Sequence, residues 1–320
     1  MQLIVLLNIP NYYSSYYLFG LQQEFKIKFK MDRRFEKFNN SPILIFQIND
    51  RLIVIDNDDP SGINSELYQL AEIYFVTNKL KGVDAYEQKK IKPLFPHYPI
   101  NVLPLYFKIF GLNLFRYLSF KQVLREIYIY TKRPIYSLNT QPIIKDNFVF
   151  FSSHIWKKEF EVNMIRAEFI KFCRKDPRIK FEGGFVPRSD GNNLGFDNVL
   201  SNKHYSPKVF SKLSNKSKIG LNNPAVCGAV SWRLAEYLNS GLFILSFPFK
   251  IELPIKLRHG KEIHFVESSW DYKTTLDKIL NEPYYHEKLS LNAKKYFDKF
   301  CTPRAQVKYI FDIINKNNSI

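Results

Sequence analysis

The part of the sequence that most restricts the fold lies between residues 217 and 267. The apolar run Ser217–Leu221 is followed by a loop, a helical pattern from Val230 to Asn239, Gly241, and the apolar run Phe243–Ser246. Glycine often ends a helix because it adopts a left-handed backbone conformation without strain. Short apolar runs with turn residues on either side are typical of buried strands. The stretch therefore predicts a strand–helix–strand crossover within a largely parallel sheet.

The same alternation of strands and helices runs through the rest of the chain, which predicts the α/β class. Strands are expected at residues 2–8, 43–48, 52–55, 73–76, 148–151, 179–181 and 263–266. The pattern restarts after the breakers Pro134 and Pro142 and the polar pair Lys145-Asp146. We therefore expect an N-terminal domain at 1–145, a C-terminal domain at 146–302, and a final helix at 303–320 that packs back on the first domain.

Composition excludes several classes of protein. The 320 residues are 45% apolar, which is enough to build a core and excludes a disordered or collagen-like chain. The cysteines Cys173, Cys227 and Cys301 form no C-x-x-C pair, so neither a disulfide scaffold nor a zinc ribbon is expected. No apolar run reaches the ~18 residues that a membrane span needs. A cytoplasmic protein is the expectation.

The net charge of +17 leaves three kinds of partner open: nucleic acid, an anionic membrane surface and a phosphate-bearing ligand. The alternative is that the lysines are a compositional bias on solvated surfaces, since Lys, Asn, Ile, Phe and Tyr are abundant together. The sequence contains no RRM, KH, zinc-finger or arginine-rich motif. Nucleic acid is therefore not an expected partner.

Arg233 and Glu236 are the most informative polar pair, because they lie three residues apart on the predicted helix and share one of its faces. The start of that helix follows the carboxyl end of a strand, which is where open α/β sheets bind ligands. A guanidinium suits a diphosphate, and a carboxylate one turn further suits paired ribose hydroxyls. The alternative is an ordinary i,i+3 surface ion pair, which would contribute only a few tenths of a kcal/mol.

With these residues in place, the stretch resembles the donor-binding half of GT-B glycosyltransferases, whose pattern is Arg-x-x-Glu-x-x-x-x-Gly followed by an apolar strand. The downstream residues His259–Phe265, Asp271–Leu280 and Asn292–Lys295 resemble the strand and helices that follow in that family. The resemblance covers about residues 147–314, and over the N-terminal half it is one of architecture only. It implies two Rossmann-like domains facing across a cleft, with the acceptor side in the first domain and the nucleotide-sugar site in the second.

The resemblance also assigns donor-binding residues. It implies that Glu236 holds the donor ribose, and that Arg233 and Arg166, with Ser231 beside them, face the diphosphate. Gly183-Gly184 occupies the place where such enzymes approach the phosphates. Retaining members of the family carry a glutamate eight residues before the second one, and here that position is Gly228. An inverting enzyme would instead take a general base from the N-terminal half.

Three residues are candidates for the catalytic group. Asp56 and Asp59 follow the apolar run Ile53–Ile55. In GT-A glycosyltransferases an Asp-x-Asp at such a place, here Asp56 and Asp58, holds a divalent cation. An Asx-rich turn that runs into Pro60 explains the same residues without a site. His154, expected just past the strand at 148–151, would touch the phosphates or the acceptor, and its alternative is a structural histidine. No histidine pair has metal-ligand spacing.

The segment Val102–Phe120 interleaves many aromatic and aliphatic residues with Lys108 and Arg116. Such a pattern suits docking on an anionic membrane. A buried helix pair with two cations at its edge explains it equally well.

The sequence-based hypothesis is a metal-independent GT-B glycosyltransferase that needs no cofactor and moves a sugar from a nucleotide-sugar to an acceptor hydroxyl. The acceptor would be a glycan or a lipid-linked molecule in surface polysaccharide or lipopolysaccharide assembly, reached from the cytoplasmic face of the membrane. Two alternatives stay open: a metal-dependent GT-A enzyme using Asp56 and Asp58, and a non-catalytic basic protein that binds nucleic acid or anionic glycan.

Overall fold

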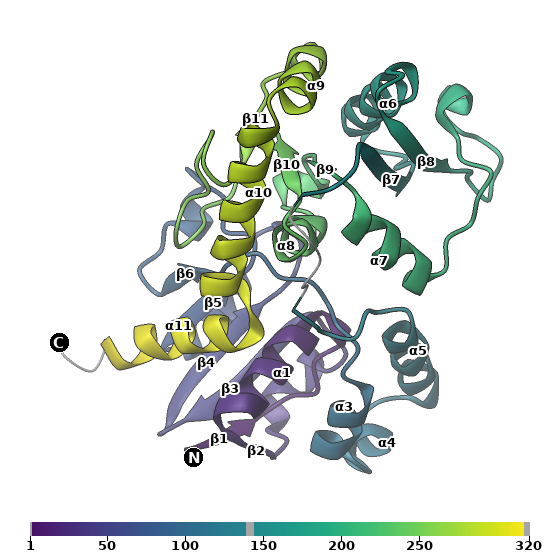
Figure 1. The fold of residues 1–320 in the computed structure, drawn as a ribbon. Coiled ribbons are helices and arrows are strands. Elements are labelled where there is room, and N and C mark those ends of the chain that lie inside the picture. The colour runs from purple at the N-terminus through teal and green to yellow at the C-terminus, as the bar shows by residue number, and fades with distance from the viewer. Residues whose placement is uncertain (1, 139–143, 317–320) are drawn as a thin grey trace. The chain divides into compact units, whose positions relative to one another are not determined.

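The structure is a computed structural model that describes residues 2–138 and 144–316. The chain divides into two compact units (Figure 1). Unit 1 combines residues 1–137, 250–256 and 298–320, and unit 2 combines residues 138–249 and 257–297. The domain bounds 1–145, 146–302 and 303–320 stay predictions, as does the assignment of acceptor and donor binding to the two units.

Unit 1 is built on one six-stranded sheet with the order β2-β1-β3-β4-β5-β6. All neighbouring strands run parallel except β3, which is antiparallel to both β1 and β4. The strands are β1 (Leu3–Leu6), β2 (Lys26–Phe29), β3 (Ile43–Ile48), β4 (Arg51–Asp56), β5 (Ile73–Val76) and β6 (Ile91–Pro93). The reversal of β3 follows from the tight turn at Asn49-Asp50, where both residues have positive φ, as the primed hairpin turns require.

The helices of unit 1 come from both ends of its sequence. They are α1 (Ser15–Glu24), α2 (Ser65–Leu70), α3 (Leu103–Phe110), α4 (Asn113–Tyr117), α5 (Phe120–Thr131) and α11 (Pro303–Lys316). Helix α11 packs on α1 (Figure 1). Buried hydrogen bonds join the two segments, since the Tyr17 hydroxyl donates to Gln306 Oε1 at 3.3 Å and Gln306 Nε2 donates to the Pro96 carbonyl at 3.1 Å.

Unit 2 contains parallel strands and helices that alternate along the chain. The strands are β7 (Phe148–His154), β8 (Lys180–Val186), β9 (Ile219–Asn222), β10 (Phe243–Ser246) and β11 (His264–Phe265). They pair in parallel as β7-β8 and as β11-β10-β9. The Lys218 N–H donates to the Phe148 carbonyl at 2.7 Å, so β7 lies beside β9. The predicted α/β fold with two Rossmann-like units is confirmed by these two sheets.

The helices of unit 2 enclose one apolar core. They are α6 (Phe160–Lys175), α7 (Pro207–Lys216), α8 (Arg233–Asn239), α9 (Asp271–Asn281) and α10 (Pro283–Tyr296). Inward side chains of every strand except β11 and of α6, α9 and α10 form the core, among them Phe151, Phe169, Phe243 and Leu276. The carboxyl ends of β7, β9 and β10 leave this core at the same edge of the sheet, because the strands are parallel.

The glycine pair Gly183-Gly184 lies inside β8, with φ of 119° and 140°. A Cβ on Gly183 would stand 2.1 Å from the Phe151 carbonyl oxygen of β7, so only glycine allows this strand pair to approach. The Arg174 guanidinium then ties the region together by donating to the carbonyls of Gly183, Asn198 and Leu200. The strand, predicted to run from 179 into the glycines, continues through both of them to Val186.

Candidate functional site

The turn that ends α8 fixes the place of Arg233 and Glu236. Gly241 has φ of 56°, its N–H donates to the Leu238 carbonyl at 3.2 Å, and the Leu242 N–H donates to the Tyr237 carbonyl at 3.1 Å. These two bonds form a Schellman motif, so the predicted glycine stop is confirmed. At its other end α8 begins at Arg233, three residues later than the predicted Val230, because residues 226–228 form a separate 3-10 turn.

Arg166 projects from α6 toward the carboxyl end of β7. The residue is only 3% exposed, and its guanidinium lies over the Trp156 ring at 3.8 Å from the centroid. Trp156 is held by Asn163 of the same helix, which accepts from the Trp156 N–H at 3.1 Å and donates to its carbonyl at 2.7 Å. Arg166 Nη1 donates to the His154 carbonyl at 3.3 Å, whereas Nε has no hydrogen-bond partner.

Arg233 approaches the same strand end from α8. Its Nη2 donates to the Ser152 carbonyl, and its guanidinium lies 5.2 Å from the Phe151 ring centroid and 5.6 Å from that of Phe210. Ser231 precedes the helix, and its Oγ accepts from the Arg233 N–H at 3.4 Å. The structure therefore brings together four of the predicted residues, namely His154, Arg166, Ser231 and Arg233.

The two arginines carry their charge without a carboxylate beside it. Among the described residues, neither Arg166 nor Arg233 forms an ion pair within 4.0 Å, and the charge of Glu159 acts on Arg166 only from further away. Burial, and then the charge of Arg233, lower the pKa of Arg166 to about 9. A buried cation destabilises the fold unless something compensates its charge. The carboxyl end of β7 therefore carries two neighbouring positive charges, one of them buried.

His154 is the last residue of β7, whereas the prediction placed it just past a shorter strand. Partial burial, followed by the charges of Arg233 and Arg166, lowers the pKa of its imidazole. The neutral form of the ring is therefore favoured, and that form can accept a proton. Its carbonyl, rather than its ring, is the group that contacts Arg166.

Glu236 lies on α8 one turn beyond Arg233 and is half-buried. Its backbone N–H donates to the Trp232 carbonyl at 3.3 Å, and its carbonyl accepts from the Ser240 N–H at 3.0 Å. The helix places the two side chains on one face, as the spacing predicts. The donor-binding roles of Arg166, Ser231, Arg233 and Glu236 stay predictions.

A second unsatisfied polar atom lies at the end of β9, where sequence reasoning found none. Asn222 Nδ2 donates to Ser246 Oγ at 2.9 Å, and Ser246 Oγ in turn donates to the Phe247 carbonyl at 2.8 Å. Because the Ser246 hydroxyl proton is already used, the Asn222 amide must present its nitrogen to it. Asn222 Oδ1 is consequently left as a buried acceptor without a partner. The only sequence signal for this unpaired acceptor is the run Asn222-Asn223-Pro224 directly after a strand.

The aspartates of unit 1 form a local hydrogen-bonded turn. Asp56 ends β4 and is buried, with Oδ2 accepting from the Tyr74 hydroxyl at 2.6 Å and Oδ1 from the Asp58 N–H at 2.9 Å. Burial raises its pKa to about 6. Asp59 is exposed, its N–H donates to Asp58 Oδ1 at 2.9 Å, and partial burial of its carboxyl raises the pKa. The Asx-rich turn is present, and the catalytic roles of Asp56 and Asp59 stay predictions.

Neither a metal cluster nor a membrane-crossing helix occurs in the described part of the chain. Its His, Cys, Asp and Glu side chains form no group of three or more that could hold a metal ion. No helix among the described residues is long and apolar enough to cross a membrane.

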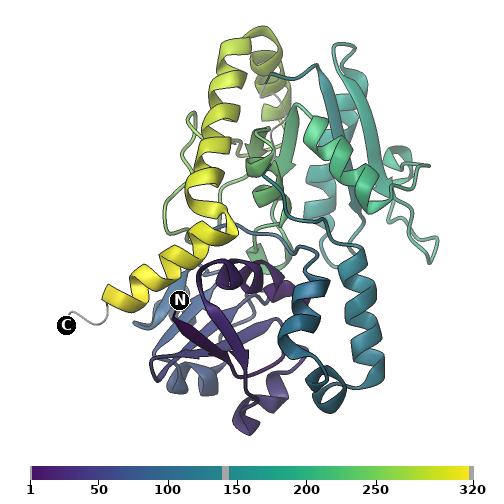
Figure 2. The ribbon, with the colours of Figure 1, turned by 60° about the horizontal axis from the view of Figure 1, so that its bottom comes forward.

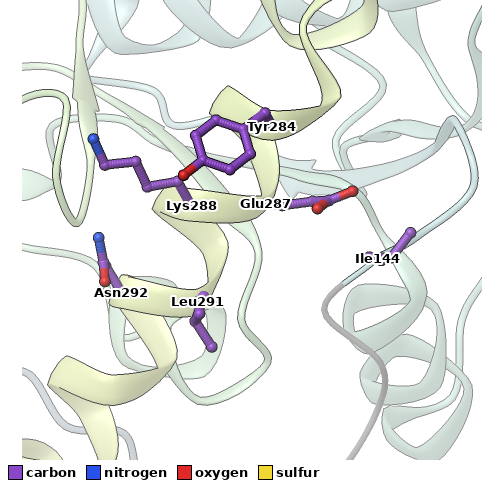
Figure 3. A pocket seen from close by; sticks show the side chains of 6 residues that line it. All are labelled: Ile144, Tyr284, Glu287, Lys288, Leu291 and Asn292. Atoms are coloured by element: carbon purple, nitrogen blue, oxygen red, sulfur yellow. The ribbon is translucent and has the colours of Figure 1, made fainter.

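A surface pocket of about 290 Å³ lies on α10 (Figure 3). It is lined by Ile144, Tyr284, Glu287, Lys288, Leu291 and Asn292. Five of these side chains come from successive turns of α10, Ile144 comes from the segment before β7, and none of the predicted site residues is among them (Figure 3). The pocket is thus separate in its residues from the arginine pair at the end of β7.

By its fold the chain is a protein of two Rossmann-like α/β units, and solved structures of sugar-processing enzymes are similar to it. They include the C-terminal domain of a glycosyl transferase group 1 family protein (LpcC) from Francisella tularensis, at 16% identity and TM-score 0.31 over 48% of this chain and 84% of that one. They also include S. aureus TarM, at 13% identity and TM-score 0.43, where 82% of this chain covers 54% of TarM.

A third similar structure is UDP-GlcNAc 2-epimerase from Neisseria meningitidis bound to UDP-GlcNAc, at 13% identity and TM-score 0.43 over 98% of this chain and 99% of that one. No family model and no curated protein matches the chain.

Proposed function

We propose that the protein is a GT-B glycosyltransferase that transfers a sugar from a nucleotide diphosphate sugar to an acceptor hydroxyl. The observation that carries the proposal is the pair Arg166 and Arg233, two neighbouring cations with no carboxylate partner at the carboxyl end of β7. A diphosphate supplies the missing negative charge, and guanidinium groups bind its oxygens well.

The proposed donor site uses the four predicted residues in separate roles. Arg166 and Arg233 bind the diphosphate, the Ser231 hydroxyl donates to one of its oxygens, and the Glu236 carboxylate accepts from the ribose hydroxyls. The Arg166 stack on Trp156 holds the guanidinium in one orientation before the ligand arrives. As the leaving diphosphate gains charge in the transition state, the same two cations stabilise it without any metal ion.

The proposed reaction is a displacement at the anomeric carbon. The acceptor oxygen forms a bond to that carbon, the bond to the diphosphate oxygen breaks, and the acceptor proton passes to a general base. Gly228 stands where retaining relatives carry a glutamate, which favours inversion. Asp59 is the preferred base in unit 1, since Asp56 is buried and already accepts two hydrogen bonds. His154 is the candidate in unit 2.

The first test is a thermal-shift panel of UDP, GDP, ADP, CMP and their common sugars on wild type and Glu236→Ala. A ligand at about 100 times its Kd stabilises the folded state by about 2.7 kcal/mol, a shift of a few degrees. We expect one nucleotide to stabilise the wild type and to lose its effect in Glu236→Ala. Glu168→Ala, which removes a carboxylate from the Lys171 surface pair, is the matched control. Stabilisation by no nucleotide would sink the proposal.

The second test separates the enzyme classes that use such donors. A transferase releases the nucleoside diphosphate only when an acceptor is present, whereas an epimerase converts the UDP-sugar alone. We propose a glycan or lipid-linked acceptor of surface polysaccharide or lipopolysaccharide assembly on the cytoplasmic side of the membrane. Loss of activity in a chelator would instead favour the metal-dependent GT-A alternative, and salt-dependent binding without nucleotide preference would favour the basic binding protein.

A further inference from the structure

The turn that follows α3 and the helices α4 and α5 of unit 1 carry a cluster of exposed apolar side chains. The cluster consists of Leu112, Phe115, Phe120, Leu124 and Tyr128, of which Leu112 is 86% and Phe120 67% exposed. All five lie within 17 residues of sequence, counted from 112 to 128. Exposed apolar side chains concentrated in this way are typical of a binding surface. We call this surface the α3–α5 face; the helices after which it is named are labelled in Figure 1 and drawn from another side in Figure 2.

The outward side of α5 is distinct from the side that packs on unit 1. Val123, Glu126 and Tyr130 are buried and face the core. Phe120, Leu124 and Tyr128 recur every four residues, which aligns them along one stripe on the opposite, exposed side. Lys121 and Arg125 are exposed cations, and each follows a residue of the stripe by one position. The exposed Lys132 follows Tyr128 by one helical turn. The helix is thus apolar on two faces, of which only one is covered by the described chain.

The turn between α3 and α4 extends the same surface. Gly111 has φ of 50° and ends α3 abruptly, which leaves Leu112 at the tip of the turn. Phe115 follows on α4, and the exposed cations Lys108 and Arg116 flank the pair. Helix α3 packs on β2, so the turn is supported by the sheet of unit 1. Apolar side chains at a tip surrounded by cations suit insertion into a layer with an anionic surface.

The stretch of chain that forms this surface exposes charges of one sign. From residue 88 to residue 145 the only carboxylate is Glu126, and it is buried beneath α5, where it accepts from the Tyr12 N–H at 2.8 Å. No negative charge of that stretch therefore reaches the surface. Each basic residue near an anionic bilayer strengthens binding about fivefold.

We infer that the α3–α5 face binds the surface of an anionic lipid bilayer. The cations contact lipid headgroups, while Leu112, Phe115 and Phe120 enter the boundary between headgroups and acyl chains. Nucleic acid fits the face less well, because neither its phosphate backbone nor the stacking of bases on aromatic rings would bury the exposed aliphatic side chains Leu112 and Leu124. The inference concerns unit 1 alone and does not depend on nucleotide-sugar binding by unit 2.

The test is sedimentation of the full chain with vesicles of phosphatidylcholine and of phosphatidylcholine with phosphatidylglycerol. We expect binding to the anionic vesicles that weakens with salt. Lys121→Gln with Arg125→Gln should weaken it about 25-fold, since two cations are lost. Leu112→Ser with Phe115→Ser should weaken it about tenfold or more and leave the salt dependence intact.

The matched control is Lys208→Gln with Lys212→Gln, which removes two exposed cations at the same spacing from α7 of unit 2. This control should bind anionic vesicles as the wild type does. The inference is overturned if the wild type does not sediment with anionic vesicles, or if the control pair loses as much binding as the α5 pair. Binding of an oligonucleotide that the α5 pair abolishes, without any vesicle binding, would assign the face to nucleic acid instead. We expect nucleotides to stabilise all of these variants as they stabilise the wild type. Vesicle binding can then be judged independently of the proposed nucleotide-sugar binding.

Discussion

The guanidinium of Arg166 lies over the ring of Trp156 at 3.8 Å from the centroid, with its Nε unpaired and no carboxylate in ion-pair contact. Aromatic stacking orients the cation and contributes about 1 to 2 kcal/mol when it is desolvated. That gain does not offset the cost of burying a charge beside Arg233. Under the proposed function, a bound diphosphate would offset this cost.

Replacement of Arg166 by methionine tests this account. Arg166→Met keeps much of the packing on Trp156 and removes the buried charge, so we expect the ligand-free protein to gain about 1 kcal/mol in its free energy of unfolding. The same variant should lose the stabilisation by nucleotide diphosphates. Urea denaturation with and without nucleotide measures both effects. A large loss of stability without ligand would show that Arg166 serves the fold instead.

Glu126 should make stability depend on pH. Burial raises the pKa of its carboxyl to about 7, so the folded state binds this proton more tightly than the unfolded state does. Its contribution is therefore fully present below about pH 4.5 and is lost as the pH rises through about 7. Glu126→Gln keeps an acceptor for the Tyr12 N–H and should become more stable than wild type, by on the order of 2 kcal/mol at pH 8.

The measurement for Glu126 is the difference in melting temperature between Glu126→Gln and wild type from pH 5 to pH 8. We expect that difference to grow with pH. Glu36→Gln, at an exposed position, is the control and should show no such trend. A constant difference for Glu126→Gln would contradict the raised pKa.

Gly183→Ala should be strongly destabilising. The new Cβ would lie 2.1 Å from the Phe151 carbonyl oxygen at a φ of 119°, so β7 and β8 would have to separate. We expect a loss of about 3 kcal/mol or more in unfolding free energy, measured by urea denaturation. The control Gly191→Ala, with φ of 72° and no atom within 4 Å, should lose only about 1 kcal/mol. A stable Gly183→Ala protein that fails to bind nucleotide would instead give the glycine a ligand-binding role.

Gly20→Ala should loosen α11 from unit 1. A Cβ on Gly20 would lie 2.4 Å from the Pro303 carbonyl oxygen and 2.8 Å from Val307, where α1 and α11 pack. We expect faster proteolysis within residues 298–316 and a stability loss of about 2 kcal/mol. Gly82→Ala, which meets no atom within 4 Å, serves as the control. Equal protease resistance of the two variants would contradict the close approach of the helices.

Local sequence patterns predicted the elements whose signal is contained in neighbouring residues. The strands Ile73–Val76 and Phe243–Ser246 have their predicted bounds, and the Asn49-Asp50 turn joins two strands as expected. Each is a short β-branched or aromatic run between turn residues. Strand β2 was missed, because Lys26–Phe29 alternates charged and apolar residues at the edge of the sheet.

The site was predictable only in part, because much of it depends on packing between distant segments. The spacing of Arg233 and Glu236 is visible in the sequence, whereas the stack of Arg166 on Trp156 depends on how Asn163 folds the preceding turn. The unpaired Asn222 Oδ1 follows from a hydrogen-bond chain through Ser246, 24 residues away. The α3–α5 face could be recognised only from the exposure of its side chains. The sequence pattern of residues 102–120 does not distinguish a buried helix from an uncovered one.

The division of unit 1 among three chain segments has a consequence for synthesis. The chain passes between the units at 137/138, 249/250, 256/257 and 297/298. A nascent chain that has just emerged through residue 297 holds all of unit 2, whereas unit 1 still lacks α11. Although most of unit 1 is translated before unit 2, unit 1 is therefore completed after unit 2. Until then, the surface of α1 that packs on α11 stays uncovered. During that interval α1 is the place where a chaperone would bind and where premature aggregation would begin.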